Sequence, residues 1–163
     1  MAEYWNIVES IQARHDSFLQ EKPEPEMSIS YEVGHKDFIN SGKASSEIKL
    51  MLKRLGVNPE ILRRVAIASY EAEINITAHS LGGKIICNIY LNCVHIVFND
   101  SGPGIKSIEK ALEPGWSTAD DLVREMGFGA GLGLPNIKKN SDVMHIDSEE
   151  GKNTLLEIII FFD

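Results

Sequence analysis

A long helix followed directly by two apolar strands is the pattern that most restricts the fold of this chain. Between Pro59 and His79, apolar residues recur every three or four positions, which is the spacing of a helix surface that faces a core. Proline is acceptable in the first turn of such a helix, and Gly82-Gly83 predicts its end. The core-facing stripe is Leu62, Val65, Ser69, Ala72 and Ile76.

Further elements are predicted after this helix. Residues 84–91 and 94–98 have the pattern of strands joined by a tight turn around Asn92. The later sequence predicts helices at 108–112 and 134–140 and strands at 143–146 and 154–162. Strands on both sides of two substantial helices indicate an α+β fold, a two-layer sandwich in which helices cover one face of a mixed sheet.

The segment before the long helix divides into three parts. Residues 1–20 predict a weakly amphipathic helix, and residues 21–26, with two prolines and alternating charge, predict an extended linker. We therefore expect residues 1–26 to form an appendage, either a docking or dimer-contact helix or a helix packed on the surface of a domain at 27–163. A strand is predicted from Met27 to Val33, with a short partner at Phe38 and Ile39, and a helix capped by Ser45 or Ser46 follows.

Composition excludes several classes of function. The 163 residues carry 16 Lys and Arg against 24 Asp and Glu, a formal net charge of -8, whereas a dedicated nucleic-acid binder needs clustered cations. No stretch approaches the ~20 apolar residues that cross a bilayer, and the N-terminus lacks a secretory signal, so we expect a cytoplasmic protein without a membrane partner. Cys87 and Cys93 lack the spacing of a zinc motif, and we interpret them as reduced, buried thiols.

Glu71 and Asn75 are the first candidate site residues. They stand four positions apart on the long helix and so project from the same face, at the edge of its apolar stripe. A carboxamide oxygen is a suitable ligand for Mg²⁺, and a carboxylate beside it can deprotonate or orient a hydroxyl or water. A solvated helix surface is the alternative interpretation.

The second candidate is the run Asp100-Ser101-Gly102-Pro103-Gly104, which follows the apolar strand 94–98. An acid at a strand end can accept a hydrogen bond from a ligand amine, and the glycines allow the backbone to approach closely. A plain turn is the alternative, because these residues are also typical of turns.

The third candidate is the alternating series Gly127, Gly129, Gly131 and Gly133, directly ahead of the predicted helix 134–140. Exposed main-chain N–H groups next to a helix N-terminus favour phosphate binding, whereas the alternative is a flexible loop. The series is neither a Rossmann fingerprint nor a Walker A loop. A fourth element, Gly151-Lys152-Asn153-Thr154, opens the last predicted strand.

The four elements, in this order, resemble the GHKL (Bergerat-fold) ATPase superfamily over about residues 28–163. The bacterial anti-sigma factor and switch-protein serine kinases have a similar sequence to this chain at Gly115-Trp-Ser-Thr118 and in the glycine series that leads into Leu134-Pro135. The resemblance implies an ATP pocket on a two-layer α/β sandwich, with ATP and Mg²⁺ as cofactors.

The resemblance also implies a role for each matching residue. Glu71 would be the general base, Asn75 the Mg²⁺ ligand, and Asp100 the acceptor for the adenine amino group. Thr154 would support Asp100 from the neighbouring strand. The glycines would shape the pocket floor or fold over the phosphates, and they are Gly102, Gly104, Gly127, Gly129, Gly131 and Gly133.

The function expected from this resemblance is a serine/threonine protein kinase that phosphorylates a small antagonist protein and regulates transcription or a stress response. A sigma factor is a second expected partner, and a homodimer is compatible with this class. The sequence departs from the kinases at Ala119-Asp120-Asp121, where many carry a basic residue. This departure favours the main alternative, a nucleotide-gated binding module without turnover. A detached histidine-kinase catalytic domain is the other alternative.

Overall fold

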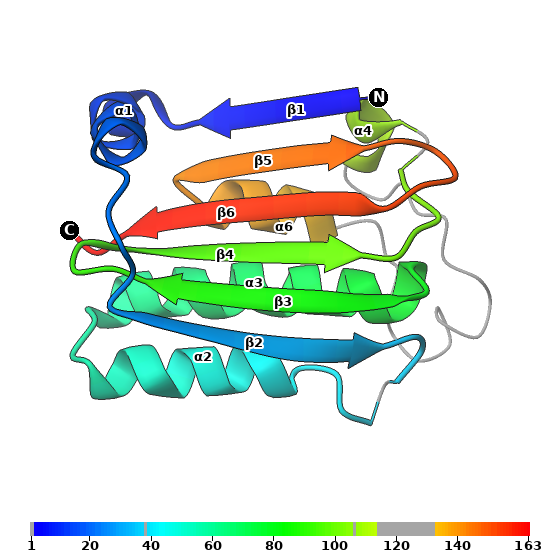
Figure 1. The fold of residues 1–163 in the computed structure, drawn as a ribbon, viewed down its shortest axis with the longest axis horizontal. Coiled ribbons are helices and arrows are strands. Elements are labelled where there is room, and N and C mark those ends of the chain that lie inside the picture. The colour runs from blue at the N-terminus through cyan, green and yellow to red at the C-terminus, as the bar shows by residue number, and fades with distance from the viewer. Residues whose placement is uncertain (1, 38, 106, 114–132) are drawn as a thin grey trace.

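The fold was analysed in a computed structural model that describes residues 2–37, 39–105, 107–113 and 133–163. Among these residues, six strands form one sheet. Helices lie behind this sheet in the view of Figure 1. The elements are β1 (Ala2–Ile7), η1 (Glu9–Ile11), α1 (Gln12–Glu21), β2 (Met27–Gly34), α2 (Lys43–Arg54), α3 (Pro59–His79), β3 (Gly82–Ile89), β4 (Cys93–Asp100), α4 (Ile108–Ala111), α6 (Gly133–Asn140), β5 (Val143–Ser148) and β6 (Thr154–Phe161).

The sheet has the order β1-β5-β6-β4-β3-β2. Every neighbouring pair among these described strands is antiparallel, so the prediction of a mixed sheet is wrong. The reason is the position of β6, which lies between β4 and β5 and runs opposite to both. The prediction of an α+β fold is confirmed.

The main core lies between the sheet and the helices α2, α3 and α6. The predicted apolar stripe of α3 is buried, and this helix has the predicted bounds because Pro59 occupies its first turn and the Asn58 side chain accepts a hydrogen bond from Glu60 N. Alternate residues of the strands pack on α3, for example Ile96 and Phe98 of β4.

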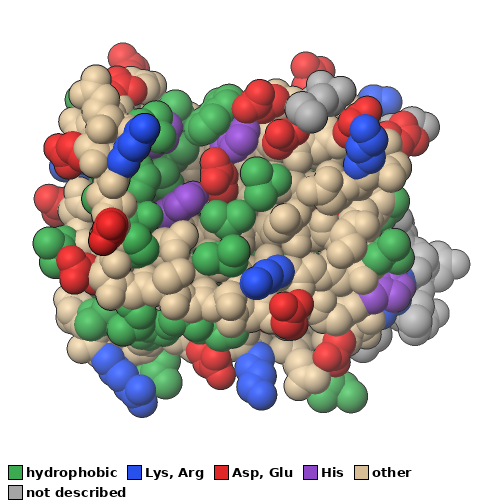
Figure 2. Space-filling model, in the orientation of Figure 1, with side chains coloured by type: hydrophobic (Ala, Val, Ile, Leu, Met, Phe, Trp, Pro, Cys, Tyr) green, Lys and Arg blue, Asp and Glu red, His purple; other side chains and the backbone are tan. Residues whose placement is uncertain are grey.

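The opposite face of the sheet is covered only at one end among the described residues. There Ile11 and Phe18 pack on Val143, Ile159 and Phe161, whose side chains alternate with those of the main core. The rest of this face is the side turned to the viewer in Figure 2, where acidic and histidine side chains lie beside hydrophobic ones.

The N-terminal prediction is wrong for residues 2–7. They form the edge strand β1, paired with β5 from Ala2↔Ser148 to Ile7↔Val143, and the helix is restricted to Gln12–Glu21. Long-range pairing with β5 decides this structure, and a local pattern cannot reveal it. Residues 22–25 lack regular structure, and Glu21, at the start of the predicted linker, belongs to α1.

Two further local predictions also differ. Ile39 lies in an exposed turn, Phe38 lies outside the described residues, and β2 pairs with β3 instead of a short neighbour. The helix α2 begins at Lys43, ahead of both predicted serine caps. Its N-terminus is satisfied by Glu73 of α3, which is 2% exposed and accepts hydrogen bonds from Ala44 N (3.2 Å) and Ser45 N (2.9 Å).

Cys87 and Cys93 are free and buried, as expected, and burial raises the pKa of each thiol to about 12. In the part of the chain that the structure describes, no helix combines the length and apolar character that a membrane crossing requires.

Candidate functional site

The structure places Glu71 and Asn75 on the exposed margin of α3, beside the buried Ala72 and Ile76. Both side chains are half-buried and face the first residue of α6. A Cβ placed on Gly133 would lie 2.9 Å from Asn75 Oδ1 and 3.4 Å from Glu71 Oε2. The start of α6 therefore lies close enough to both predicted polar residues that a side chain at Gly133 would meet them.

Glu71 has the electrostatic environment of a candidate base. Burial raises the pKa of its carboxyl above the ordinary value, and a hydrogen bond from the Asn136 side chain opposes that shift. A carboxyl group whose pKa is raised toward neutral pH accepts a proton more readily, which suits general-base chemistry. Asn136 was not predicted as a site residue, although its place three residues after Gly133 in the first turn of α6 is a usable signal.

Asp100 ends β4 and is held by two backbone donors. Its Oδ1 accepts hydrogen bonds from Gly102 N (2.8 Å) and Thr154 N (3.0 Å). Burial raises the pKa of the carboxyl, and these two hydrogen bonds oppose the shift. The other oxygen, Oδ2, has no hydrogen-bond partner among the described residues.

Thr154 connects Asp100 to the neighbouring strands. Its hydroxyl lies 2.6 Å from Ser148 Oγ on β5, and Ser148 Oγ accepts a hydrogen bond from Ile105 N (2.8 Å). Ser148 was also not predicted. It is a short hydroxyl-bearing residue in the last position of β5, and this position is the signal that could have found it.

The two predicted glycines after Asp100 pack against the turn between β5 and β6. Gly102 has φ 104° and Gly104 has φ 84°, both in the left-handed region. A Cβ on Gly102 would lie 2.9 Å from Lys152 O, and one on Gly104 would overlap Glu149 O. Side chains are therefore excluded at both positions, because the backbone there approaches the turn between β5 and β6 closely.

The structure thus forms two groups, one around Glu71 and one around Asp100. Both groups border the same hydrophobic core. This core contains residues close in sequence to the site residues: Ala72 next to Glu71, Phe98 two positions before Asp100, and Leu134 next to Gly133. Gly127, Gly129 and Gly131 lie outside the described residues, as do Ser117, Thr118, Asp120 and Asp121.

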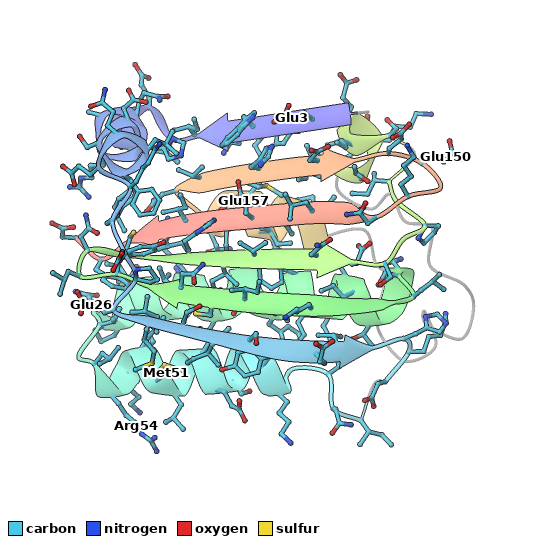
Figure 3. The ribbon with its side chains drawn as sticks, viewed as in Figure 1. Glu3, Glu26, Met51, Arg54, Glu150 and Glu157 are labelled. Carbon is cyan, nitrogen blue, oxygen red and sulfur yellow. The ribbon has the colours of Figure 1, made fainter. Side chains whose placement is uncertain are left out.

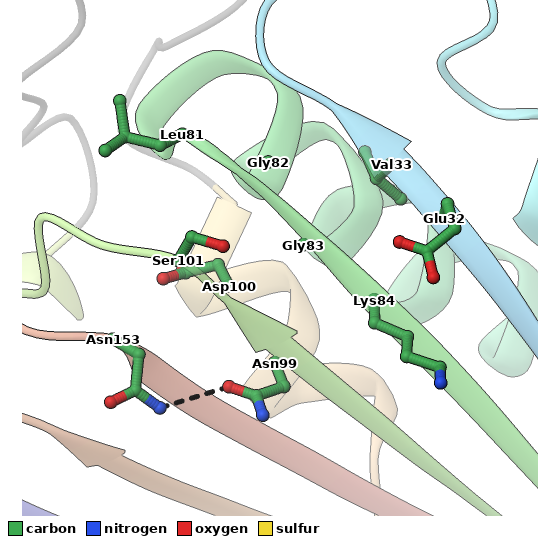
Figure 4. A pocket seen from close by; sticks show the side chains of 10 residues that line it. All are labelled: Glu32, Val33, Leu81, Gly82, Gly83, Lys84, Asn99, Asp100, Ser101 and Asn153. Atoms are coloured by element: carbon green, nitrogen blue, oxygen red, sulfur yellow. Dashed lines mark hydrogen bonds between the residues drawn. The ribbon is translucent and has the colours of Figure 1, made fainter.

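A hollow of about 590 Å³ adjoins Asp100 at the ends of β2, β3 and β4 (Figure 4). Its described lining is polar and includes Asn99 and Asn153, whose side chains share a 3.1 Å hydrogen bond. Of the predicted site residues that the structure describes, only Asp100 lines it. The hollow therefore extends from the Asp100 group, and the Glu71 group lies apart from it.

Comparison with known proteins gives several relatives. The chain is 30% identical over 111 residues to the serine/threonine-protein kinase RsbT of Bacillus subtilis, covering 66% of this chain and 77% of RsbT. It is 26% identical over 121 residues to an anti-sigma F factor of Clostridium novyi (71% and 81%) and 34% identical over 95 residues to one of Clostridium acetobutylicum (55% and 63%).

No protein-family model matches the chain. A chain in the crystal structure of the SiaB-SiaC complex from Pseudomonas aeruginosa aligns with a TM-score of 0.46 and 14% identity, over 93% of this chain and 97% of that chain.

Proposed function

Because this chain belongs to the family of partner-switch serine/threonine-protein kinases that includes RsbT and the anti-sigma F factors, we propose that it transfers the γ-phosphoryl group of ATP to a small antagonist protein. As a member of this family it is a serine/threonine-protein kinase. The acceptor would be a serine or threonine of the antagonist, and a sigma factor is a second candidate partner.

The Asp100 group supports binding of the adenine. Oδ1 is occupied by two backbone N–H groups, which hold the carboxylate in one orientation, and Oδ2 faces no described donor. An acceptor oriented in this way suits the exocyclic amino group of adenine. The left-handed glycines Gly102 and Gly104 let the backbone after Asp100 pack closely against the turn between β5 and β6, which supports the strand end that carries this carboxylate.

The Glu71 group supports the magnesium and phosphate end of the site. Asn75 Oδ1 is the type of oxygen that Mg²⁺ accepts, and it lies against the glycine that opens α6. Bound Mg²⁺ would neutralise charge on the phosphates during transfer. Glu71, with its raised pKa, would accept the proton of the attacking hydroxyl.

The fold type that we propose is the GHKL ATPase sandwich. Its support is the order in which the motifs occupy the fold: Glu71 and Asn75 on the central helix, Asp100 at the end of the next hairpin, and Gly133 at the start of α6. Thr154 opens the final strand next to Asp100. The contact of Gly133 with both Asn75 and Glu71 is the single observation that carries the proposed function, because it joins two motifs far apart in sequence.

The test is phosphoryl transfer from radiolabelled ATP to purified proteins encoded in neighbouring genes. We expect acid-stable label on one of them, loss of labelling with Glu71→Ala, and retained labelling with the control Glu60→Ala on the exposed first turn of the same helix. Acid-labile label would indicate a histidine kinase instead. ATP-dependent partner binding without label would indicate the nucleotide-gated module.

A further inference from the structure

Four ionisable side chains form a connected cluster on the open face of the sheet, away from the proposed kinase site. They come from four strands: Glu3 of β1, His145 of β5, Glu157 of β6 and His95 of β4. Figure 3 labels Glu3 and Glu157 on the strands at either side of β5. We call these four residues the His145 cluster.

His145 is the centre of the cluster because both of its ring nitrogens face carboxylates. Nδ1 lies 2.9 Å from Glu157 Oε1, and Nε2 lies 2.7 Å from Glu3 Oε1. An ionised carboxylate can only accept hydrogen bonds. Both contacts are therefore hydrogen bonds only when His145 carries a proton on each nitrogen, as the imidazolium.

The cluster attaches an edge strand to the sheet. Among the described strands, β1 pairs only with β5, and Trp5 stands directly opposite His145 in this pairing. The Trp5 ring stacks on the imidazole with centroids 3.9 Å apart, and its Nε1 donates a 3.1 Å hydrogen bond to Glu3 Oε1. Two neighbouring outward-facing side chains of β1 thus depend on the position of His145.

The surrounding groups favour the ionised form of Glu157. His95 Nε2 lies 3.1 Å from the second oxygen of Glu157, and this hydrogen bond, with that from His145, lowers the pKa of Glu157 against the effect of burial. His15 of α1 lies near Trp5, at 6.0 Å between ring centroids, and Asp147 is the next residue of β5 on the same face. His95 needs one ring proton for its contact, whereas His145 needs two.

We propose that protonated His145 is a clamp that holds β1 on the sheet, and that loss of its second proton releases Glu3 and loosens β1. Histidine changes charge between about pH 5 and pH 8. A neutral His145 retains one donor, so one carboxylate faces a lone pair. Glu3 is the one that can turn to water, because its side chain is 52% exposed and that of Glu157 is 26% exposed. Release of β1 makes β5 the edge of the sheet.

Amide hydrogen exchange of the complete chain at pH 6 and pH 8, corrected for the intrinsic pH dependence of exchange, tests the clamp. We expect protection of the β1 amides to be about tenfold higher at pH 6, since hydrogen bonds to charged groups are strong, with no such change in β3 inside the sheet. In His145→Gln the difference should vanish, because a carboxamide does not change its protonation between pH 6 and pH 8. The matched control His95→Gln keeps a single donor and should retain the difference.

Equal β1 protection at both pH values in the wild type, or a difference that persists in His145→Gln, would overturn the proposal. If His145→Gln does not fold, Glu3→Gln at the exposed end of the cluster gives the same information. Its amide can donate to a neutral imidazole, so we expect β1 protection to become independent of pH. A wild-type pH difference in Glu3→Gln would also overturn the clamp.

Discussion

Replacement of Gly133 by alanine tests whether Asn75 must keep its position for nucleotide binding. The new Cβ would lie 2.9 Å from Asn75 Oδ1 and 3.4 Å from Asn75 Nδ2. Ordinary contacts of carbon begin near ~3.5 Å, so the carboxamide must move by about 0.5 Å. The backbone itself accepts alanine, because Gly133 is absent from the glycines with positive φ.

The expected effects on binding and on stability have opposite signs. A displacement of about 1 Å in a site can cost about a hundredfold in activity, so we expect a loss of about tenfold in affinity for Mg²⁺-ATP. Alanine in place of glycine gains up to about 1 kcal/mol of helix propensity, which offsets the strain at Asn75. The free energy of unfolding should therefore change by less than about 1 kcal/mol.

The assay is titration of the variant with ATP in excess Mg²⁺, together with urea denaturation. Gly34→Ala is the control, because Gly34 also has no positive φ and its nearest atoms belong to Asp37. Wild-type affinity in Gly133→Ala, with stability unchanged, would refute the argument that Asn75 takes part in the nucleotide site. A large loss of stability would refute the argument that only the carboxamide must move.

Three further predictions concern other described residues. Glu73→Ala leaves the N–H groups of Ala44 and Ser45 without their acceptor. The free energy of unfolding should fall by about 2 to 3 kcal/mol, which calorimetry would show as a fall of about 5 to 10 °C in melting temperature. Glu73→Gln should lose less. A wild-type melting temperature in Glu73→Ala would contradict this. Asp100→Asn keeps an acceptor for its two backbone donors but presents an NH₂ group to adenine. The affinity for ATP should therefore fall about tenfold to a hundredfold in a fluorescence titration, while the melting temperature stays nearly constant. An unchanged affinity would exclude adenine recognition by Asp100. Burial lowers the pKa of His15 below 6.5, so the unfolded chain binds this proton more readily and stability is lost as the pH falls below that value. His15→Leu should therefore reduce the difference in unfolding free energy between pH 8 and pH 5. An unchanged difference would refute this role of His15.

Local sequence patterns were sufficient to predict a helix or strand wherever one strong apolar periodicity determines it. The helix α3 was predicted with its observed bounds, and the hairpin of β3 and β4 with its turn, because their apolar repeats agree with their turn residues. The strand β1 was missed because Tyr4 and Val8 also fit a helical spacing, and only pairing with β5 selects the strand. The cap of α2 was missed because Glu73 supplies it from another helix.

The candidate site was also predictable only in part from local sequence patterns. The motifs located Glu71, Asn75 and Asp100, whose roles remain proposals, but the contact of Gly133 with Asn75 depends on how α6 packs against α3. The His145 cluster was not predicted, because 142 positions separate Glu3 from His145. Its signal was the presence of His145 and Glu157 between apolar neighbours in β5 and β6.

Isothermal titration of the full chain with ATP, with and without Mg²⁺, tests the central claim most directly. Convergence of α3, the end of β4 and the start of α6 on one nucleotide site predicts saturable binding of one ATP per chain, weaker without Mg²⁺ and weaker again in Asp100→Asn. An absence of any heat of binding at millimolar ATP with excess Mg²⁺ would contradict it.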